Sequence, residues 1–152
     1  MTIPNPPTTD LRFVVGYDGS PPATRALRAA ANLLQGRQGG IDVLYVEHIP
    51  SMASLSAGAV AELESGFGEI DEELRTMAAE ELRGREERWA FEHRQGPIAE
   101  ELLAAARDIG EARPQATVVI VVGSSSTAAH RMVGSVAVHL ARHSPVPVVV
   151  VP

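Results

Sequence analysis

The chain has 152 residues, a net charge of −6, no cysteine and no lysine, so that arginine supplies every basic side chain other than histidine. This length fits one domain with a core of its own. The missing cysteine excludes disulfides, thiolate metal sites and iron–sulfur clusters, and the missing lysine excludes a phosphate-loop lysine, a Schiff base and the lysine of receiver domains. The arginines are scattered singly rather than clustered, and no aromatic platform accompanies them, which argues against a basic face that binds nucleic acid.

The first ten residues (MTIPNPPTTD) are rich in proline and carry no basic side chain and no apolar run. They therefore resemble neither a signal peptide nor a membrane anchor, and we expect a flexible arm over residues 1–10 before one domain over residues 11–152. The longest apolar run, near Val118 to Val122, is too short to span a membrane. We expect a soluble, cytoplasmic protein that does not bind membranes.

The domain begins with a short apolar run and a helical pattern. Arg12 to Tyr17 (RFVVGY) predicts a strand that is covered on both faces. Ser20 can cap a helix and Pro21 suits its first turn, where the missing N–H would be unpaired anyway. Apolar residues at helical spacing follow as far as Gly36, and Ile41 to Val46 predicts the second strand.

The middle of the chain is less regular. Residues 49–68 are rich in serine, alanine and glycine and predict a mobile loop without fixed structure. A second helix is expected to bury one apolar face between Ile70 and Leu82 and to expose its acidic residues. Trp89 to His93 alternates like a strand with one exposed side, which is typical of a position near a sheet edge.

The last third predicts two helices and two strands. A third helix shows one apolar face from Ile98 to Ile109, and Ala116 to Val122 is the most apolar strand, which we expect to be central. After a polar loop, Gly134 to His143 predicts the last helix and Val146 to Val151 the last strand. The order βαβαβαβαβ requires crossover helices, and hence a doubly wound α/β domain with a parallel sheet and helices on both faces.

In such sheets, ligands bind beyond the carboxyl ends of the strands, where the strand order reverses. Two segments leave strand ends with suitable residues: residues 16–20 (GYDGS) after the first strand, and residues 123–127 (GSSST) after the fourth, which lead to Gly134 and Ser135. Glycines let the backbone approach a phosphate, and a helix N-terminus offers N–H donors. Polar loops of this kind also occur without any ligand.

Four stretches of the sequence resemble the universal stress protein family, in the right order over nearly the whole chain: VVGYDGSPPATRAL, GPIAEELLAAA, VVIVVGSSS and VGSVAVHLARHSPVPVVVV. The resemblance implies the adenine nucleotide alpha hydrolase-like fold, with five strands in the order 3-2-1-4-5. It also implies an ATP site between the ends of strands one and four. Carried over position by position, it puts Asp18 beside the ribose and phosphates, Val46 against the adenine, and Gly123, Gly134 and Ser135 against the phosphates.

The phosphate loop departs from the family's pattern, Gly-x2-Gly-x9-Gly-Ser/Thr. Ser126 stands at the middle glycine, and ten residues rather than twelve separate Gly123 from Gly134. A serine with positive φ would cost about 1–2 kcal/mol. The shortening changes which N–H groups can converge on a phosphate, and the hydroxyl residues from Ser124 to Thr127, with His130 or Arg131, are candidates to compensate.

Several residues have competing interpretations. Asp18 either contacts a ligand or only stabilises a turn before Gly19. His139 and His143 have the i, i+4 spacing of a metal pair, but a cation at a helix C-terminus is favourable without metal, and we expect no metal site. The serines after Gly123 lack the second glycine of a nucleophile elbow, which argues against a hydrolase.

The valine-rich strand from Val146 to Val151 is expected at a sheet edge, where unpaired backbone groups invite a second chain. The family commonly dimerises through this strand, so the resemblance implies a homodimer, within limits that three flanking prolines set. We expect a regulatory binding module for ATP or another adenine nucleotide, without efficient catalysis and with Mg²⁺ only alongside the nucleotide. The alternatives are a nucleotide-free dimeric interaction protein and a slow Mg²⁺-dependent ATPase.

Overall fold

Five parallel strands form one sheet in the computed structural model, which describes residues 9–48, 57–85, 88–124 and 134–152. The strand order is β3-β2-β1-β4-β5, as the resemblance implies. β3 and β5 lie at the two edges and β4 lies inside the sheet, between β1 and β5, all as expected. The strands are β1 (Leu11–Gly16), β2 (Gly39–Glu47), β3 (Trp89–Gln95), β4 (Thr117–Gly123) and β5 (Val148–Val151).

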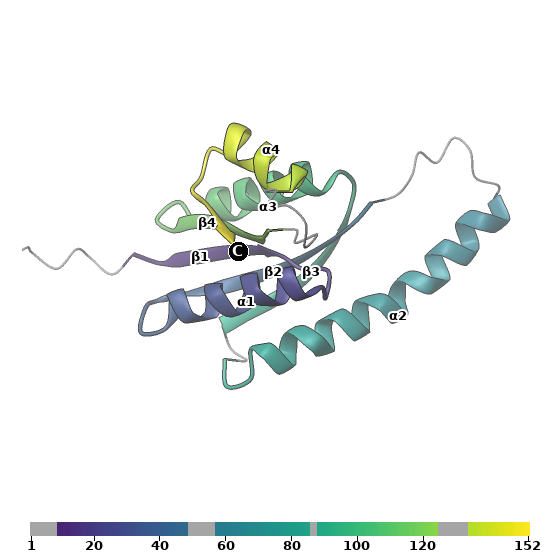
Figure 1. Cartoon of the computed structure of the whole chain (residues 1–152), viewed down its shortest axis with the longest axis horizontal. Coiled ribbons are helices and arrows are strands. Elements are labelled where there is room, and N and C mark those ends of the chain that lie inside the picture. The colour runs from purple at the N-terminus through teal and green to yellow at the C-terminus, as the bar shows by residue number, and fades with distance from the viewer. Residues whose placement is uncertain (1–8, 49–56, 86–87, 125–133) are drawn as a thin grey trace, which may run out of the picture.

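In the described part of the chain, four helices cover the two faces of the sheet: α1 (Pro21–Leu34), α2 (Ala57–Glu81), α3 (Ile98–Ala112) and α4 (Ser135–His143). α1 and α2 lie on one face and α3 and α4 on the other (Figure 1). This is the expected doubly wound architecture, because right-handed crossovers on either side of β1 send the helices to opposite faces. No helix in the described part of the chain is both long enough and apolar enough to cross a membrane.

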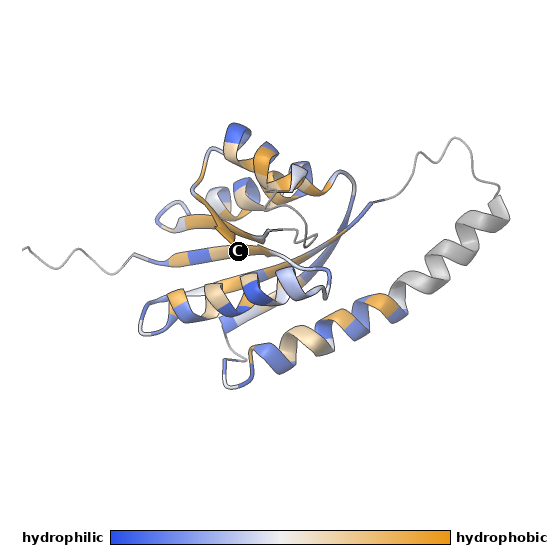
Figure 2. Ribbon diagram, in the orientation of Figure 1, coloured by the Kyte–Doolittle hydropathy of each residue, from blue (hydrophilic) through white to orange (hydrophobic). Residues whose placement is uncertain are grey.

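Each face of the sheet has its own hydrophobic core. One is built with α1 and α2 and contains Leu27, Ile41 and Val121, and the other is built with α3 and α4 and contains Leu102, Ile120 and Leu140. Figure 2 shows the apolar residues running along the strands and the hydrophilic residues on the outer sides of the helices. Because aromatic residues are few, aliphatic side chains and alanines supply almost all of the buried surface.

The expected loop over residues 49–68 is wrong from residue 57 onward, because α2 begins at Ala57. Residues 49–56 lie outside the described residues. The segment combines helix-breaking glycines with alanine, glutamate and leucine, which are strong helix formers. Each interior glycine costs about 1 kcal/mol relative to alanine, but a helix that is already anchored extends at low cost. That anchor is the docked part of α2, where Leu74 and Ala78 are buried, together with the buried Leu82 directly after the helix.

The predicted start of α1 is confirmed, and the predicted start of the last strand changes by two residues. Ser20 is the N-cap of α1, its hydroxyl accepts a hydrogen bond from the Ala23 N–H, and a proline occupies the first turn. The last strand begins at Val148 rather than Val146. Pro147 lacks an N–H for the ladder, although its carbonyl oxygen still accepts a hydrogen bond from the Ile120 N–H at 3.0 Å.

An ion pair joins α1 and α2, which lie on the same face of the sheet. Arg28 on α1 donates two hydrogen bonds to Glu81 on α2, at 2.6 and 2.8 Å. These hydrogen bonds lower the pKa of the Glu81 carboxyl group. The unfolded chain therefore binds a proton at this position more readily than the folded protein does, and the pair stabilises the fold above the ordinary carboxyl pKa.

Glu81→Gln is expected to lower the free energy of unfolding slightly at pH 7, because the charged pair is lost while the side-chain volume is kept. The difference from the unmodified protein should shrink below about pH 4.3, the ordinary glutamate pKa, and vanish as the pH falls through the lowered one. Urea unfolding at pH 7 and at pH 3 measures it. Glu80→Gln is the control, since Glu80 pairs with Arg83, three residues further along the chain, and not with α1. An equal loss in both variants would contradict a role in joining the helices.

Candidate functional site

A cleft of about 260 Å³ opens at the carboxyl edge of the sheet, between the ends of β1, β2 and β4 and the first turns of α1, α3 and α4. The strand order reverses here, since β2 and β3 lie on one side of β1 and β4 and β5 on the other. Open α/β sheets bind ligands at this position, because the loops diverge and leave a crevice. The cleft is therefore the candidate functional site.

Five of the seven predicted site residues line this cleft: Asp18, Val46, Gly123, Gly134 and Ser135. Ser124 is not part of the lining; its backbone N–H donates to the Val151 carbonyl oxygen at 2.8 Å and so continues the pairing of β4 with β5. Ser126 lies outside the described residues, as do Thr127, His130 and Arg131. The remaining lining residues come from the same strand ends and helix starts: Gly16, Tyr17, Ser20, Pro22, Ala23, Leu44, Ile98, Leu102, Val122, Val136 and Ala137.

Asp18 is both a turn residue and a cleft residue. One of its carboxylate oxygens, Oδ1, accepts a hydrogen bond from the Ser20 N–H at 3.0 Å, and Gly19 between them has φ +76°. This hydrogen bond fixes the turn that leads into α1. The side chain is exposed at the cleft, and it is the only charged side chain among the described lining residues. The two interpretations of Asp18 are thus compatible, because the turn uses a single oxygen.

Gly123 has a packing role that its place in a loop motif does not reveal. A Cβ atom at this position would lie 2.3 Å from the carbonyl oxygen and 2.4 Å from the carbonyl carbon of Pro22. The end of β4 therefore approaches the first turn of α1 closely, backbone against backbone. Only glycine allows this contact, so the packing of α1 on β4 requires Gly123 whether or not a ligand is bound.

The opposite wall of the cleft is the start of α4. Gly134 is the N-cap of this helix and has no side chain to accept hydrogen bonds from the first turn. The N–H groups of that turn have no partner within the helix, and the helix dipole makes this end favourable for an anion. Ser135 adds a hydroxyl group at the same place. This end of the cleft suits a phosphate or carboxylate group.

The other end of the cleft is apolar. It is formed by Leu44 and Val46 from β2 and by Ile98 and Leu102 from α3, and Val122 from β4 adds a further apolar side chain to the lining. Of these, only Val46 was among the predicted site residues. The missed residues carry no polar signal, and their alternation or helical spacing marked them as core. A site wall made of core side chains is visible only once the strand ends are placed together.

Val46 also presents backbone groups at the cleft. The Leu44 carbonyl oxygen accepts from the Tyr17 N–H at 2.9 Å, toward β1, and the Glu47 carbonyl oxygen accepts from the Gly96 N–H at 3.0 Å, toward β3. Successive residues of a strand turn their N–H and C=O groups to opposite sides. The N–H and C=O of Val46 therefore face the β1 side, where β1 has already ended and the cleft begins.

Tyr17 belongs to the cleft only in part. Its side chain is buried in the core under α1 and α2, which raises the pKa of its phenol chiefly through loss of hydration. The phenol therefore stays protonated at neutral pH. Tyr17 anchors the start of the turn at Asp18 in the core under α1 and α2 and does not provide an ionised group to a ligand.

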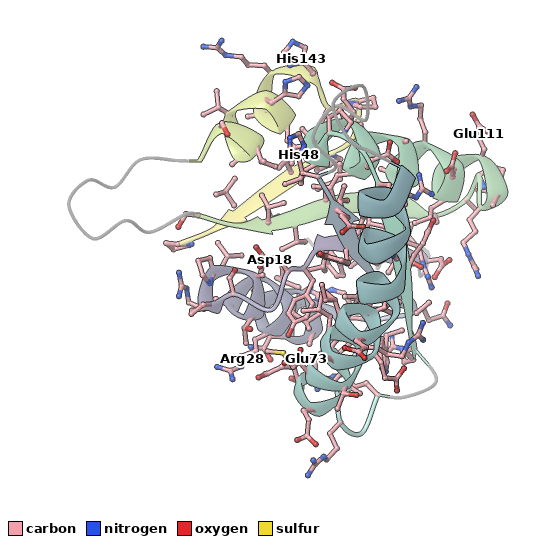
Figure 3. The ribbon with its side chains drawn as sticks, turned by 90° about the vertical axis from the view of Figure 1, so that its right-hand side faces the viewer. Asp18, Arg28, His48, Glu73, Glu111 and His143 are labelled. Carbon is pink, nitrogen blue, oxygen red and sulfur yellow. The ribbon has the colours of Figure 1, made fainter. Side chains whose placement is uncertain are left out.

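Two histidine clusters lie apart from the cleft lining. His93 contacts Asp71 at 2.9 Å and Glu47 at 3.3 Å, on the α2 side of the sheet. His139 and His143 stack with ring centroids 4.4 Å apart. His143 lies at the outer end of α4, well away from Asp18 (Figure 3). Within the described part of the chain, no three histidine, aspartate or glutamate side chains are arranged to hold a metal ion.

The family comparison matches residues 11–152 to the Universal stress protein family. Among solved structures, the chain is similar to a universal stress protein in complex with cAMP, with 22% identity, 95% of this chain and 98% of that chain covered, and a TM-score of 0.64. It is also similar to a protein of this family from Burkholderia pseudomallei, with 26% identity, 93% and 95% coverage, and a TM-score of 0.64.

A third similar structure is a universal stress protein family protein from Arabidopsis thaliana with AMP bound, with 12% identity, 93% of this chain and 90% of that chain covered, and a TM-score of 0.59. No curated protein is similar enough in sequence to count as a match. The solved structures share the fold of the chain over nearly its full length.

Proposed function

Because the chain belongs to the universal stress protein family, we propose that its cleft binds an adenine nucleotide and that the protein acts as a regulatory binding module rather than as an enzyme. The observation that carries this proposal is the polarity of the cleft. One end is apolar, the middle holds a single carboxylate, and the other end is an uncapped helix N-terminus. A nucleotide has the same sequence of parts: an apolar base, a hydroxylated sugar and an anion. Two structures of the same fold contain cAMP and AMP.

The base end offers a pair of hydrogen-bonding groups as well as apolar walls. The N–H and C=O of Val46 face the cleft side by side at the rim. Adenine offers a ring nitrogen acceptor next to an amino donor, which is the complement of such a pair. Guanine has the donor and acceptor reversed at these positions and would leave both backbone groups unpaired, at a cost of about 1–3 kcal/mol each. The cleft is therefore expected to prefer adenine over guanine.

The remaining walls of the cleft offer contacts for the sugar and the phosphates. The second oxygen of Asp18 accepts a hydrogen bond from a ribose hydroxyl, while the first stays on the Ser20 N–H. The N–H groups at the start of α4 and the Ser135 hydroxyl donate to the phosphate. A divalent cation enters only together with the nucleotide, whose phosphates supply most of its oxygen ligands.

Asp18→Asn tests the sugar contact without disturbing the turn. The amide oxygen of asparagine still accepts from the Ser20 N–H, but the amide nitrogen cannot accept from a ribose hydroxyl. We expect about tenfold weaker binding of adenosine, AMP, cyclic AMP and ATP, because one hydrogen bond to a charged group is lost. Thermal unfolding should be unchanged. Isothermal titration of nucleotide-stripped protein, with and without Mg²⁺, measures it. Free adenine, which lacks the sugar, should bind both proteins equally.

The two alternatives give different results in the same titrations. If no heat and no thermal stabilisation are seen at millimolar concentrations of all four compounds, the protein is a nucleotide-free interaction module. Steady Mg²⁺-dependent release of phosphate from ATP, lost in Asp18→Asn, would instead support a slow ATPase, for which Asp18 is the only carboxylate in the described lining.

We extend the proposal to a homodimer that pairs β5 with its copy. β5 lies at the edge of the sheet and pairs with β4 on one side only, and its four valines are all partly exposed. Such an edge can be extended by a second copy of the same strand. The dimer and a location in the cytoplasm both stay predictions from the sequence.

A further inference from the structure

We propose that Ile98, in the first turn of α3, covers the face of the bound base and sets the preference of the site for a large planar base. The assignment rests on the proposed function and adds a residue to it. The sequence pattern placed Ile98 on the buried face of α3. The structure leaves it 39% exposed and at the cleft.

The position of Ile98 follows from the helix that carries it. Leu102 lies four residues later on the same side of α3 and is fully buried beneath the cleft. Residues four apart are neighbours on a helix surface. Since α3 starts at the carboxyl edge of the sheet, the apolar row runs from the core at Leu102 up to the rim at Ile98. The apolar wall of the cleft thus continues to Ile98, whose side chain the rest of the protein does not cover fully.

An isolated exposed isoleucine needs no explanation in itself. Four other large apolar side chains are comparably exposed in the described part of the chain: Leu33, Ile70, Met77 and Val138. Ile98 differs from all four in that it lines the cleft. It belongs to α3, which packs against β2, the strand that carries Leu44 and Val46, whereas the phosphate is expected at the start of α4, the other helix on this face. A ligand seated against Ile98 removes its side chain from water, which favours binding in proportion to the apolar area covered.

If Ile98 contacts the base, the loss of affinity on its removal should depend on the base and not on the phosphates. The base is common to adenosine, AMP, cyclic AMP and ATP, so removing the contact must weaken all four by the same factor. A contact to phosphate would instead spare adenosine. Because a purine presents a wider apolar face than a pyrimidine, the ratio of adenosine to cytidine affinity must also fall.

The experiment compares Ile98→Ala, Ile98→Leu and Val138→Ala by titration with adenosine, AMP, ATP and cytidine. Val138 on α4 is the matched control, since it is also 39% exposed but does not line the cleft. We expect about tenfold weaker binding of the three adenine compounds to Ile98→Ala, since roughly two buried methylene equivalents are lost. The leucine variant should recover to within about threefold of the unmodified protein, because it keeps the apolar area.

Thermal unfolding should be nearly the same for all four proteins, because both positions are exposed. Equal affinities of Ile98→Ala and Val138→Ala would overturn the assignment while leaving the proposed function intact. A loss confined to AMP and ATP would also overturn it, since it would move the contact to the phosphate. If the unmodified protein binds none of the adenine compounds, the proposed function itself fails and this assignment with it.

Discussion

Gly123→Ala is expected to lower the free energy of unfolding by about 3 kcal/mol, a large part of the total for a domain of this size. The added Cβ would lie 2.3 Å from the Pro22 carbonyl oxygen. A neighbouring side chain could rotate away from such a contact, but a backbone carbonyl cannot. Either the end of β4 or the first turn of α1 must shift, which strains the sheet or breaks the capped start of the helix.

Gly110→Ala is the matched control for this substitution. Gly110 lies inside α3, and a Cβ there would meet nothing within 4 Å. Alanine at that position should stabilise the protein by about 0.5–1 kcal/mol, because glycine is the poorer helix former. Urea unfolding followed by circular dichroism gives both values. The same chemical change should therefore have opposite signs at the two sites, and equal small effects would contradict the close approach of β4 to α1.

A loss of stability in Gly123→Ala would also affect nucleotide binding. Gly123 lines the cleft and matches the first glycine of a phosphate-loop pattern, so weaker nucleotide binding by a Gly123 variant would invite a functional explanation. The contact with Pro22 shows that such a variant changes the shape of the cleft through the fold. Asp18→Asn and Ile98→Ala avoid this difficulty, since the first keeps the turn and the second removes an exposed side chain.

Leu102→Ala is expected to destabilise the protein by about 3–4 kcal/mol. Leu102 is fully buried in the core under α3 and α4 and packs beneath Gly16, where its methyl groups would lie 3.4 and 3.5 Å from a Cβ. Truncation removes three buried carbon atoms and leaves a cavity that β1 and β4 cannot close, because their ladder hydrogen bonds fix their spacing. The cavity would also open into the floor of the cleft.

Leu33→Ala provides the comparison, since Leu33 on α1 is 43% exposed. The same substitution there should cost less than about 1 kcal/mol. Equilibrium unfolding in urea, with the slope checked to be unchanged, separates the two. A loss of under 1 kcal/mol at Leu102 would mean that the core under α3 is looser than the structure indicates. Leu102 and Ile98, one helical turn apart, should thus act on different properties: stability for the first and affinity for the second.

The strand and helix order could be predicted from the sequence because its signals are local. Alternating apolar runs and helical spacing mark each element, and Ser20 with Pro21 marks the start of α1. The general location of the site followed as well. In a parallel sheet the carboxyl ends of all strands meet at one edge, so residues that follow strand ends, such as Asp18 and Gly123, must come close together there. The family resemblance supplied the strand order and the importance of Val46.

Only the tertiary structure decided the features that depend on distances between segments remote in sequence. The start of α2 at Ala57 depends on the docking of the later part of that helix, the requirement for glycine at position 123 on the approach of α1, and the exposure of Ile98 on where the sheet stops. Helical spacing predicts which side chains share a face of a helix. It does not predict how much of that face a neighbouring element buries, because the buried fraction is set by the length and register of strands elsewhere in the chain.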